Sequence, residues 1–351
     1  MMGMESTDFF SHVPDLSASA RAEAWKVQAQ LTKPAGSLGR LEELGAWVAS
    51  VHDIVPPPQI QKPRVVVFAG DHGIAARGVS NFDPIVSIQT FDNIASGGAG
   101  VCALARTHGA TIRLVDISLD RESDDPHHVR RASGAIDVEN AMSEDELARA
   151  LNAGIDIANE EIDGGADVLI PGDLGIGNTT IAAALIGSYT RTEPVKVTGR
   201  GSGIDDELWK PKVAAVRDAM FRARSLGRDP FKVLAAIGSP DIAAMAAFMA
   251  QAAVRRVPVI LDGAIVAAAA LWGNRLAPGA SNYWVAGHRS PEPAHTYALE
   301  ELSLTPIIEM SMRLGEGSGA VEALPHLRSA VNVFHYMATF ESAGVGTALC
   351  K

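Results

Sequence analysis

The chain has 351 residues, of which 47% are hydrophobic, and a formal net charge of -11 at pH 7. This length and composition are typical of a globular protein with one large domain and a smaller one. The acidic balance, without any block of basic residues, argues against nucleic acid and anionic membrane surfaces as partners.

Neither the start of the chain nor its cysteines indicate export or membrane insertion. The first ten residues lack the basic segment and apolar run of a signal peptide. The longest apolar run, residues 264–272, is too short to span a bilayer. Cys102 and Cys350 lie far apart and match no zinc or disulfide pattern. We therefore expect a reducing, cytoplasmic compartment.

In chain order, helical spacing of leucines predicts a helical region over 15–52, and prolines at 56–58 mark a boundary. Short runs that are apolar throughout then alternate with helical stretches, which predicts strands buried on both faces of a parallel sheet. These predicted strands are 65–69, 112–117, 168–170, 195–198, 257–261 and 283–286. The tail from residue 292 onward, including 320–340, is expected to be helical.

Residues 172–180, Gly-Asp-Leu-Gly-Ile-Gly-Asn-Thr-Thr, follow one predicted strand and precede a helix predicted over 181–187. Glycines allow a ligand to approach the backbone, and free N–H groups at a helix start bind phosphate. The alternative is an ordinary turn capped by Asn178 or Thr179. No lysine follows the glycines, so this is not a Walker motif.

Two further Gly-rich segments carry charged residues. Residues 199–207, Gly-Arg-Gly-Ser-Gly-Ile-Asp-Asp-Glu, are followed by Lys212. These residues are typical of a loop that binds an anion, or alternatively of a flexible loop that precedes a helix. In 315–319, Gly-Glu-Gly-Ser-Gly, Glu316 precedes a predicted helix. Its carboxylate can line a site, or it can simply interact favourably with the helix dipole.

Histidines and aspartates near strand ends raise the question of a metal. Asp71 and His72 follow the first strand, while His288 and His295 follow the last one. Their spacing matches no metal-ligand pattern, and rigid local turns are favoured. No Gly-x-Ser-x-Gly elbow follows a strand either. We expect neither a metal nor a cofactor.

Together and in this order, the segments resemble the family of nicotinate-nucleotide:dimethylbenzimidazole phosphoribosyltransferases over nearly the whole chain. The matching stretches are 33–42, 68–74, 175–180, 199–207, 259–263, 288–290, 314–320 and 337–340. The resemblance implies an α/β fold, with a Rossmann-like parallel sheet flanked by helices over 61–290. It also implies a small helical domain from both chain ends, 1–60 and 291–351, and a homodimer.

The resemblance further implies roles for individual residues. Glu316 matches the family's catalytic glutamate. Asp173 stands where the family turn usually has a glutamate, so its side chain is one methylene shorter, and it is the second catalytic candidate. Ser80, Gln89, Leu314 and Gly315 are expected to line the base pocket. The residues expected to bind phosphate and ribose are Gly175, Ile176, Gly177, Asn178, Thr179, Arg200, Gly201, Lys212, Gly263 and Ser290.

The implied reaction moves the phosphoribosyl group of nicotinate mononucleotide to 5,6-dimethylbenzimidazole. Its products are α-ribazole 5'-phosphate and nicotinate, in assembly of the cobalamin nucleotide loop. Two alternatives stay open: a sister enzyme that uses adenine or a phenol as acceptor, and a non-catalytic nucleotide-binding sensor. Assays with several acceptors distinguish the sister enzyme from an enzyme that uses dimethylbenzimidazole. Turnover with release of nicotinate excludes the non-catalytic sensor.

Overall fold

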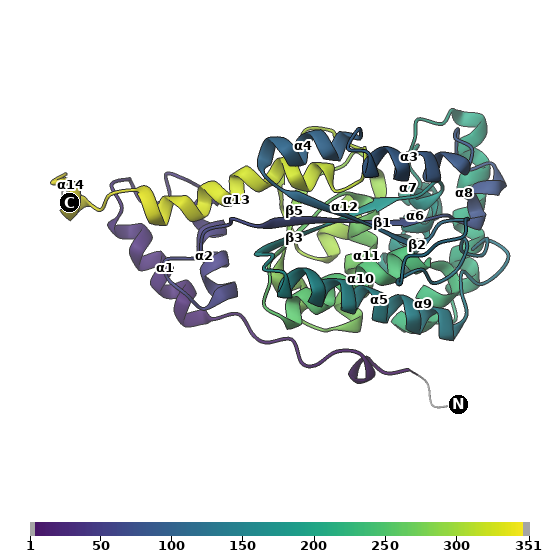
Figure 1. Ribbon diagram of the computed structural model, residues 1–351, viewed down its shortest axis with the longest axis horizontal. Coiled ribbons are helices and arrows are strands. Elements are labelled where there is room, and N and C mark those ends of the chain that lie inside the picture. The colour runs from purple at the N-terminus through teal and green to yellow at the C-terminus, as the bar shows by residue number, and fades with distance from the viewer. Residues whose placement is uncertain (1–3, 347–351) are drawn as a thin grey trace.

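The structure is a computed structural model that describes residues 4–346. Its centre is a six-stranded sheet in the order β2-β1-β3-β4-β5-β6, in which all neighbours are parallel (Figure 1). The strands are β1 (Pro63–Gly70), β2 (Thr111–Ser118), β3 (Val168–Leu174), β4 (Val259–Leu261), β5 (Trp284–His288) and β6 (Pro306–Ile308). The predicted parallel α/β sheet is confirmed.

Helices cover both faces of this sheet (Figure 1). One face is covered by α5 (Glu144–Asp163), α10 (Pro240–Val254) and α11 (Ala264–Leu276). The other is covered by α3 (Ile85–Ala95), α4 (Gly100–His108) and α13 (Ser318–Tyr336). Small residues let helices approach closely: a Cβ on Gly154 of α5 would lie 2.0 Å from the carbonyl oxygen of Ala244 on α10. The abundance of alanine and glycine therefore serves a tightly packed helical layer.

The remaining helices are α6 (Asn178–Thr190), α7 (Pro194–Val197), α8 (Asp206–Ala223), α9 (Pro230–Ile237) and α12 (Pro293–Glu301), with short 3-10 turns at Ser6–Asp8, Gly73–Arg77 and Ala280–Tyr283. Two sequence predictions were wrong. The strand predicted over 195–198 is the short helix α7, which begins at a proline suited to a first helical turn. The tail after residue 292 also contains β6, which pairs with β5.

A helical arm projects from the sheet, at the left in Figure 1. It consists of α1 (Ala18–Gln30), α2 (Arg40–His52), the end of α13 and α14 (Phe340–Ala343). Ala24, Ala46 and Phe334 pack in one apolar cluster, so both chain ends contribute to the arm. The region predicted as helical over 15–52 is interrupted at 31–39. The domain boundaries at 60 and 290 stay a prediction, and β6 continues the sheet beyond residue 290.

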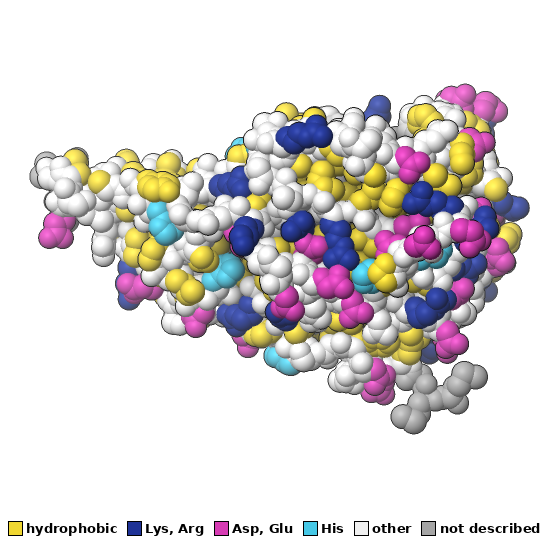
Figure 2. All heavy atoms as spheres, in the orientation of Figure 1, with side chains coloured by type: hydrophobic (Ala, Val, Ile, Leu, Met, Phe, Trp, Pro, Cys, Tyr) yellow, Lys and Arg dark blue, Asp and Glu magenta, His cyan; other side chains and the backbone are white. Residues whose placement is uncertain are grey.

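The strand order places a topological switch point between β1 and β3, because the chain leaves β1 toward β2 and returns on the other side as β3. In open parallel sheets, ligands bind at the carboxyl ends of strands near such a point. No helix within 4–346 is long and apolar enough to cross a membrane. Acidic and basic side chains are interspersed on the face shown in Figure 2.

Candidate active site

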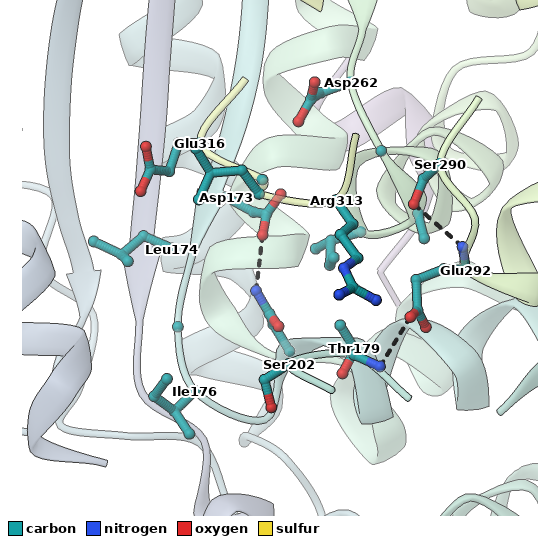
Figure 3. A pocket seen from close by; sticks show the side chains of 18 of the residues that line it. Asp173, Leu174, Ile176, Thr179, Ser202, Asp262, Ser290, Glu292, Arg313 and Glu316 are labelled. Carbon is teal, nitrogen blue, oxygen red and sulfur yellow. Dashed lines mark hydrogen bonds between the residues drawn. The ribbon is translucent and has the colours of Figure 1, made fainter. Parts of the chain in front are cut away.

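A cavity of about 290 Å³ opens at the carboxyl ends of β3, β4 and β5. Its walls come from the turn after β3, the loop that begins at Gly201, the strand ends at Asp262 and His288, and the segment before α13 (Figure 3). Phe82 and the first turns of α3 complete the rim. The cavity therefore joins segments that are distant in sequence and that the sheet brings to one edge.

The turn after β3 approaches other backbone so closely that only glycine fits. A Cβ on Gly175 would lie 2.1 Å from the carbonyl oxygen of Gly70 and 2.8 Å from Nε2 of His72. Gly177 has a φ of +95° and immediately precedes α6. The N–H of Ile176 donates to Oγ of Ser87 on α3, at 3.0 Å. The turn thus directs the start of α6 at the cavity, which favours an anion there.

Glu316 is held in an unusual backbone conformation. Gly315, Glu316 and Gly317 all have positive φ, at +82°, +62° and +85°. A non-glycine residue rarely adopts this region, and such outliers cluster at functional sites. The N–H of Glu316 donates to the carbonyl oxygen of Asp173 at 3.1 Å. Its Oε2 accepts from the N–H of Val101, in the first turn of α4, at 3.2 Å.

Burial raises the pKa of Glu316 above its usual value, and the nearby charge of Asp262 acts in the same direction. The hydrogen bond from Val101 partly opposes this shift. Only 6% of Glu316 is exposed, and its carboxylate borders the cavity. A carboxylate with a raised pKa is a stronger base, which suits acceptance of a proton from a bound ligand.

Asp173 lies at the end of β3 and is buried. Burial, followed by the charges of Asp262, Asp241 and Glu316, raises its pKa well above the usual range. Asp173 is therefore neutral at pH values where an ordinary aspartate is ionised. Its Oδ2 accepts from Nδ2 of Asn178 at 2.7 Å. Its Oδ1 has no partner within the described residues, so an O–H there is free to donate to a ligand.

Lys212 of α8 lies behind the cavity wall rather than in it. Only 1% of the residue is exposed, and its Nζ donates to Oγ1 of Thr179 at 2.7 Å. A Cβ on Gly201 would lie 3.0 Å from this ammonium group. Burial lowers the pKa of Lys212 to about 8, partly opposed by Glu292. Thr179 and Gly201 line the cavity, so the cation lies directly beneath its lining.

The loop after β5 is fixed by buried polar contacts. The N–H of Ser290 donates to Nδ1 of His295 at 3.0 Å. Burial lowers the pKa of His295 to about 3, so the ring is neutral and can accept this bond. Glu292 donates its N–H to Oγ of Ser290 at 3.3 Å and accepts from the N–H of Gly201 at 2.8 Å. Both loops are thereby held on one side of the cavity.

Most residues expected to form the site do line the cavity. They are Asp173, Gly175, Ile176, Asn178, Thr179, Gly201, Gly263, Ser290, Leu314, Gly315 and Glu316. Others expected there are absent from the lining, namely Ser80, Gln89, Gly177, Arg200 and Lys212. The side chain of Arg200 bonds to Asp206 and to the carbonyl oxygen of Ile204 instead.

Ser80 and Gln89 do not border this cavity, although their neighbours along the chain do, so their role in the base pocket stays a prediction. Oγ of Ser80 accepts from the N–H of Phe82, and Phe82 itself borders the cavity. On α3 the lining residues are Val86 and Thr90, which share a face because they are four apart. Sequence reasoning also missed Ser202, Asp262, His288, Glu292 and Arg313 as lining residues. The helical spacing of Val86 and Thr90 is the sequence signal that they share one face of α3. The position of Asp262 directly after a strand is the signal that it lies at the edge of the sheet where ligands bind.

The His and Asp residues considered for a metal occupy separate places. His72 lies behind Gly175, 3.8 Å from Asp241, while Asp71 accepts from the N–H of Asp120 at 2.9 Å. His288 and His295 pack edge to face with ring centroids 5.9 Å apart. Within the described residues, no group of three or more His, Cys, Asp or Glu side chains could hold a metal ion.

Comparisons with known proteins agree with this arrangement. A family described as phosphoribosyltransferase matches residues 13–345. A relative from Corynebacterium efficiens is 57% identical over 98% of this chain and 94% of its own. One from Mycobacterium marinum is 54% identical over 95% of this chain and 94% of its own. Both are named nicotinate-nucleotide–dimethylbenzimidazole phosphoribosyltransferase.

The crystal structure of CobT from Thermus thermophilus superimposes with a TM-score of 0.90 at 37% identity. The match covers 94% of this chain and 99% of that one. The Rossmann-like sheet flanked by helices is thus confirmed by a solved structure as well as by the strand order. With 57% identity over almost the whole length and one family matching nearly every residue, the chain belongs to the nicotinate-nucleotide–dimethylbenzimidazole phosphoribosyltransferase family.

Proposed function

We propose that this protein transfers the phosphoribosyl group of nicotinate mononucleotide to 5,6-dimethylbenzimidazole, in assembly of the cobalamin nucleotide loop. The observation that carries the proposal is the position of Glu316. Its buried carboxylate borders the same cavity as the glycine turn before α6 and as Thr179 and Gly201, which lie next to Lys212. A base for the acceptor and an anchor for the donor therefore share one cavity.

The phosphate is assigned to the side formed by the glycine turn, Gly201 and Ser290. Backbone N–H groups at the start of α6 and the buried ammonium of Lys212 favour an anion there. Thr179 links Lys212 to the cavity lining, because its Oγ1 accepts a hydrogen bond from Nζ of Lys212. Binding of the non-reacting phosphate holds the ribose in position for attack.

The acceptor base is assigned to the apolar rim of the cavity. Phe82 is 50% exposed and Leu314 is 56% exposed, and the half-buried Val86 lines the cavity with them. Large apolar side chains exposed at the mouth of a cavity are typical of a binding site for an apolar, planar group. A benzimidazole carrying two methyl groups fits that chemistry better than a more polar adenine.

The chemistry needs one base and no acid for the leaving group. As the bond between C1 of the ribose and nicotinate breaks, its electron pair returns to the ring nitrogen, which becomes neutral. One nitrogen of the acceptor forms the new bond to C1 from the opposite face, which gives the α-riboside. The proton on the other acceptor nitrogen moves to Glu316. Neutral Asp173 supplies a hydrogen-bond donor beside this site.

The direct test is turnover by the purified protein. Nicotinate and α-ribazole 5'-phosphate are separated chromatographically after incubation with nicotinate mononucleotide and one acceptor. We expect equal amounts of both products with 5,6-dimethylbenzimidazole, lower rates with adenine and phenol, and no release of nicotinate without an acceptor. Faster turnover of adenine or a phenol would favour the sister enzyme, and no turnover with any acceptor would favour a sensor.

We also propose a homodimer and a cytoplasmic location. Support for the dimer comes from the helical arm, where Trp25, Tyr336 and Val345 are 38%, 74% and 50% exposed. Hydrophobic side chains lie on its visible face in Figure 2. A second copy of the chain would bury them. The buried free thiol of Cys102 fits a reducing compartment.

A further inference from the structure

Asp262 is a buried carboxylate at the cavity to which the reaction scheme above gives no role. It follows β4, is 0% exposed, and lines the cavity together with its neighbour Gly263 (Figure 3). Oδ1 accepts from the N–H of Ala320, in the first turn of α13, at 2.9 Å. Oδ2 has no hydrogen-bond partner among the described residues.

An unpartnered buried carboxylate oxygen is costly, and such groups in folded proteins usually have a partner. The structural task of Asp262 is already performed by Oδ1, which satisfies an N–H at the start of α13. A single accepting oxygen is enough for that bond. Oδ2 is therefore available to a ligand that donates a hydrogen bond.

The position of Asp262 indicates which part of a ligand it meets. On one side are Gly263 and Ser290, in the region assigned to the phosphate; a Cβ on Gly263 would lie 3.9 Å from Cβ of Ser290. On the other side are Asp173 and Glu316, whose pKa values are raised first by burial and then in part by the charge of Asp262. Asp262 thus lies between the phosphate end and the reacting end.

In a nucleoside monophosphate, the group between the phosphate and the reacting C1 is the ribose, whose hydroxyls donate hydrogen bonds. Resting on the proposed function, we propose that Oδ2 of Asp262 accepts a hydrogen bond from a ribose hydroxyl of the donor. Acidic side chains at strand ends bind ribose hydroxyls in related sheet topologies. Nε2 of His288 lies 3.4 Å from Oδ1, so the imidazole ring is next to this carboxylate.

The substitution Asp262→Asn separates this role from a structural one. An asparagine oxygen can still accept from Ala320, but its NH₂ group replaces Oδ2 and cannot accept from a hydroxyl. The matched control is Asp241→Asn on α10, which is also 0% exposed and has unpartnered oxygens, but does not line the cavity. Each protein is assayed with nicotinate mononucleotide and its 2'-deoxy and 3'-deoxy forms.

We expect the wild type to lose about 10- to 100-fold in kcat/KM with at least one deoxy donor, as for a lost hydrogen bond to a charged group. Asp262→Asn should lose a similar factor with the ribose donor, mainly through KM, and little more with that deoxy donor. Its melting temperature should stay near that of the wild type. Asp241→Asn should keep the wild-type ratio of ribose to deoxy donors whatever its overall activity.

Equal use of all three donors by the active wild type would overturn the assignment while leaving the proposed function intact. So would an Asp262→Asn variant that keeps the wild-type ratio. If this variant does not fold, Asp262→Ser is assayed with the same donors against the same two outcomes. Absence of turnover by the wild type refutes the reaction instead; titration with ribose 5-phosphate and 2-deoxyribose 5-phosphate then tests the hydroxyl contact, and equal affinities overturn a contact to the 2'-hydroxyl.

Discussion

At the scale of single residues, Glu316 combines a strained backbone with a buried carboxylate. We predict that Glu316→Gln lowers kcat by about 10²–10⁴, because the amide cannot accept the acceptor's proton. Binding of both substrates should stay near normal, since size and polarity are retained. Steady-state kinetics with titrations of each substrate measure this. The control is Glu322→Gln on α13, where Glu322 pairs with His108 away from the cavity. Wild-type turnover in Glu316→Gln would place the base elsewhere.

Among the groups with shifted pKa values, Glu316 and Lys212 predict the pH dependence of kcat/KM, which reports on the free enzyme. Glu316 must be ionised, and its pKa is raised, so activity should fall on acidification from a pH above 4.5, the usual value for glutamate. Lys212 must be protonated to attract a phosphate. Its pKa is lowered to about 8, so activity should also fall as the pH rises through about 8.

Substitution of Lys212 tests whether its deprotonation causes the loss of activity above about pH 8. Lys212→Arg keeps a cation that does not titrate in this range, so the loss of kcat/KM near pH 8 should disappear. Lys212→Met should raise KM for nicotinate mononucleotide at neutral pH by about 10-fold or more, as for the loss of a charged partner. If kcat/KM of Lys212→Arg still falls near pH 8, another group titrates there.

At the scale of elements, β3 supports the catalytic segment through direct backbone contact. A Cβ on Gly172 would lie 2.4 Å from the carbonyl carbon of Glu316 and 2.6 Å from the N–H nitrogen of Gly317. Gly172→Ala must therefore displace Glu316. We predict destabilisation of about 1–3 kcal/mol by overpacking, and a fall of about 10² in kcat from misplacement of the carboxylate.

Thermal unfolding and steady-state kinetics measure the two effects of Gly172→Ala. The control is Gly346→Ala, where a Cβ would meet nothing within 4 Å and should leave both quantities unchanged. Normal turnover in Gly172→Ala would mean that the segment from 315 to 317 can relax without moving the carboxylate, and that the contact with β3 does not position it.

The strands were predictable from sequence where burial on both faces produced long apolar runs, as at β1 and β3. The run at 195–198, Val-Lys-Val-Thr, is too short for its pattern to separate a strand from a helix, and Pro194 favours the first turn of α7. β6 is a three-residue edge strand, only one residue of which is buried. Its pairing with β5 depends on the whole sheet and leaves no local pattern.

At the scale of the whole molecule, the exposed apolar side chains of the helical arm predict association. We expect sedimentation at micromolar concentration to give twice the mass of one chain. Tyr336→Asp, which adds a charge at a 74% exposed aromatic residue, should weaken the dimer if the arm forms the interface. Val138→Asp is the control, since Val138 is 60% exposed but lies outside the arm. A fully active wild-type monomer would refute the dimer.

The site was predictable to the extent that it follows from strand ends. Glu316 and the glycine turn are carried by local motifs, and the sheet brings both to the cavity. Asp262 was missed as a lining residue because its position after a strand places it at the ligand-binding edge of the sheet but does not show that its side chain faces the cavity. Which residues of α3 face the cavity depends on how the helix packs on the sheet, so Val86 and Thr90 could not be separated from Gln89 by local pattern.

Helix α13 begins two residues after Glu316 and ends in the helical arm, where Phe334 packs against Ala24 and Ala46. With 19 residues it is about 28 Å long. A tilt of about 5° around its distal end would shift the end next to Glu316 by about 2 Å, given this length. Displacements of about 1 Å can change rates by about 10². A substitution in the arm that tilts α13 would therefore be expected to change kcat, although no residue of the cavity is altered.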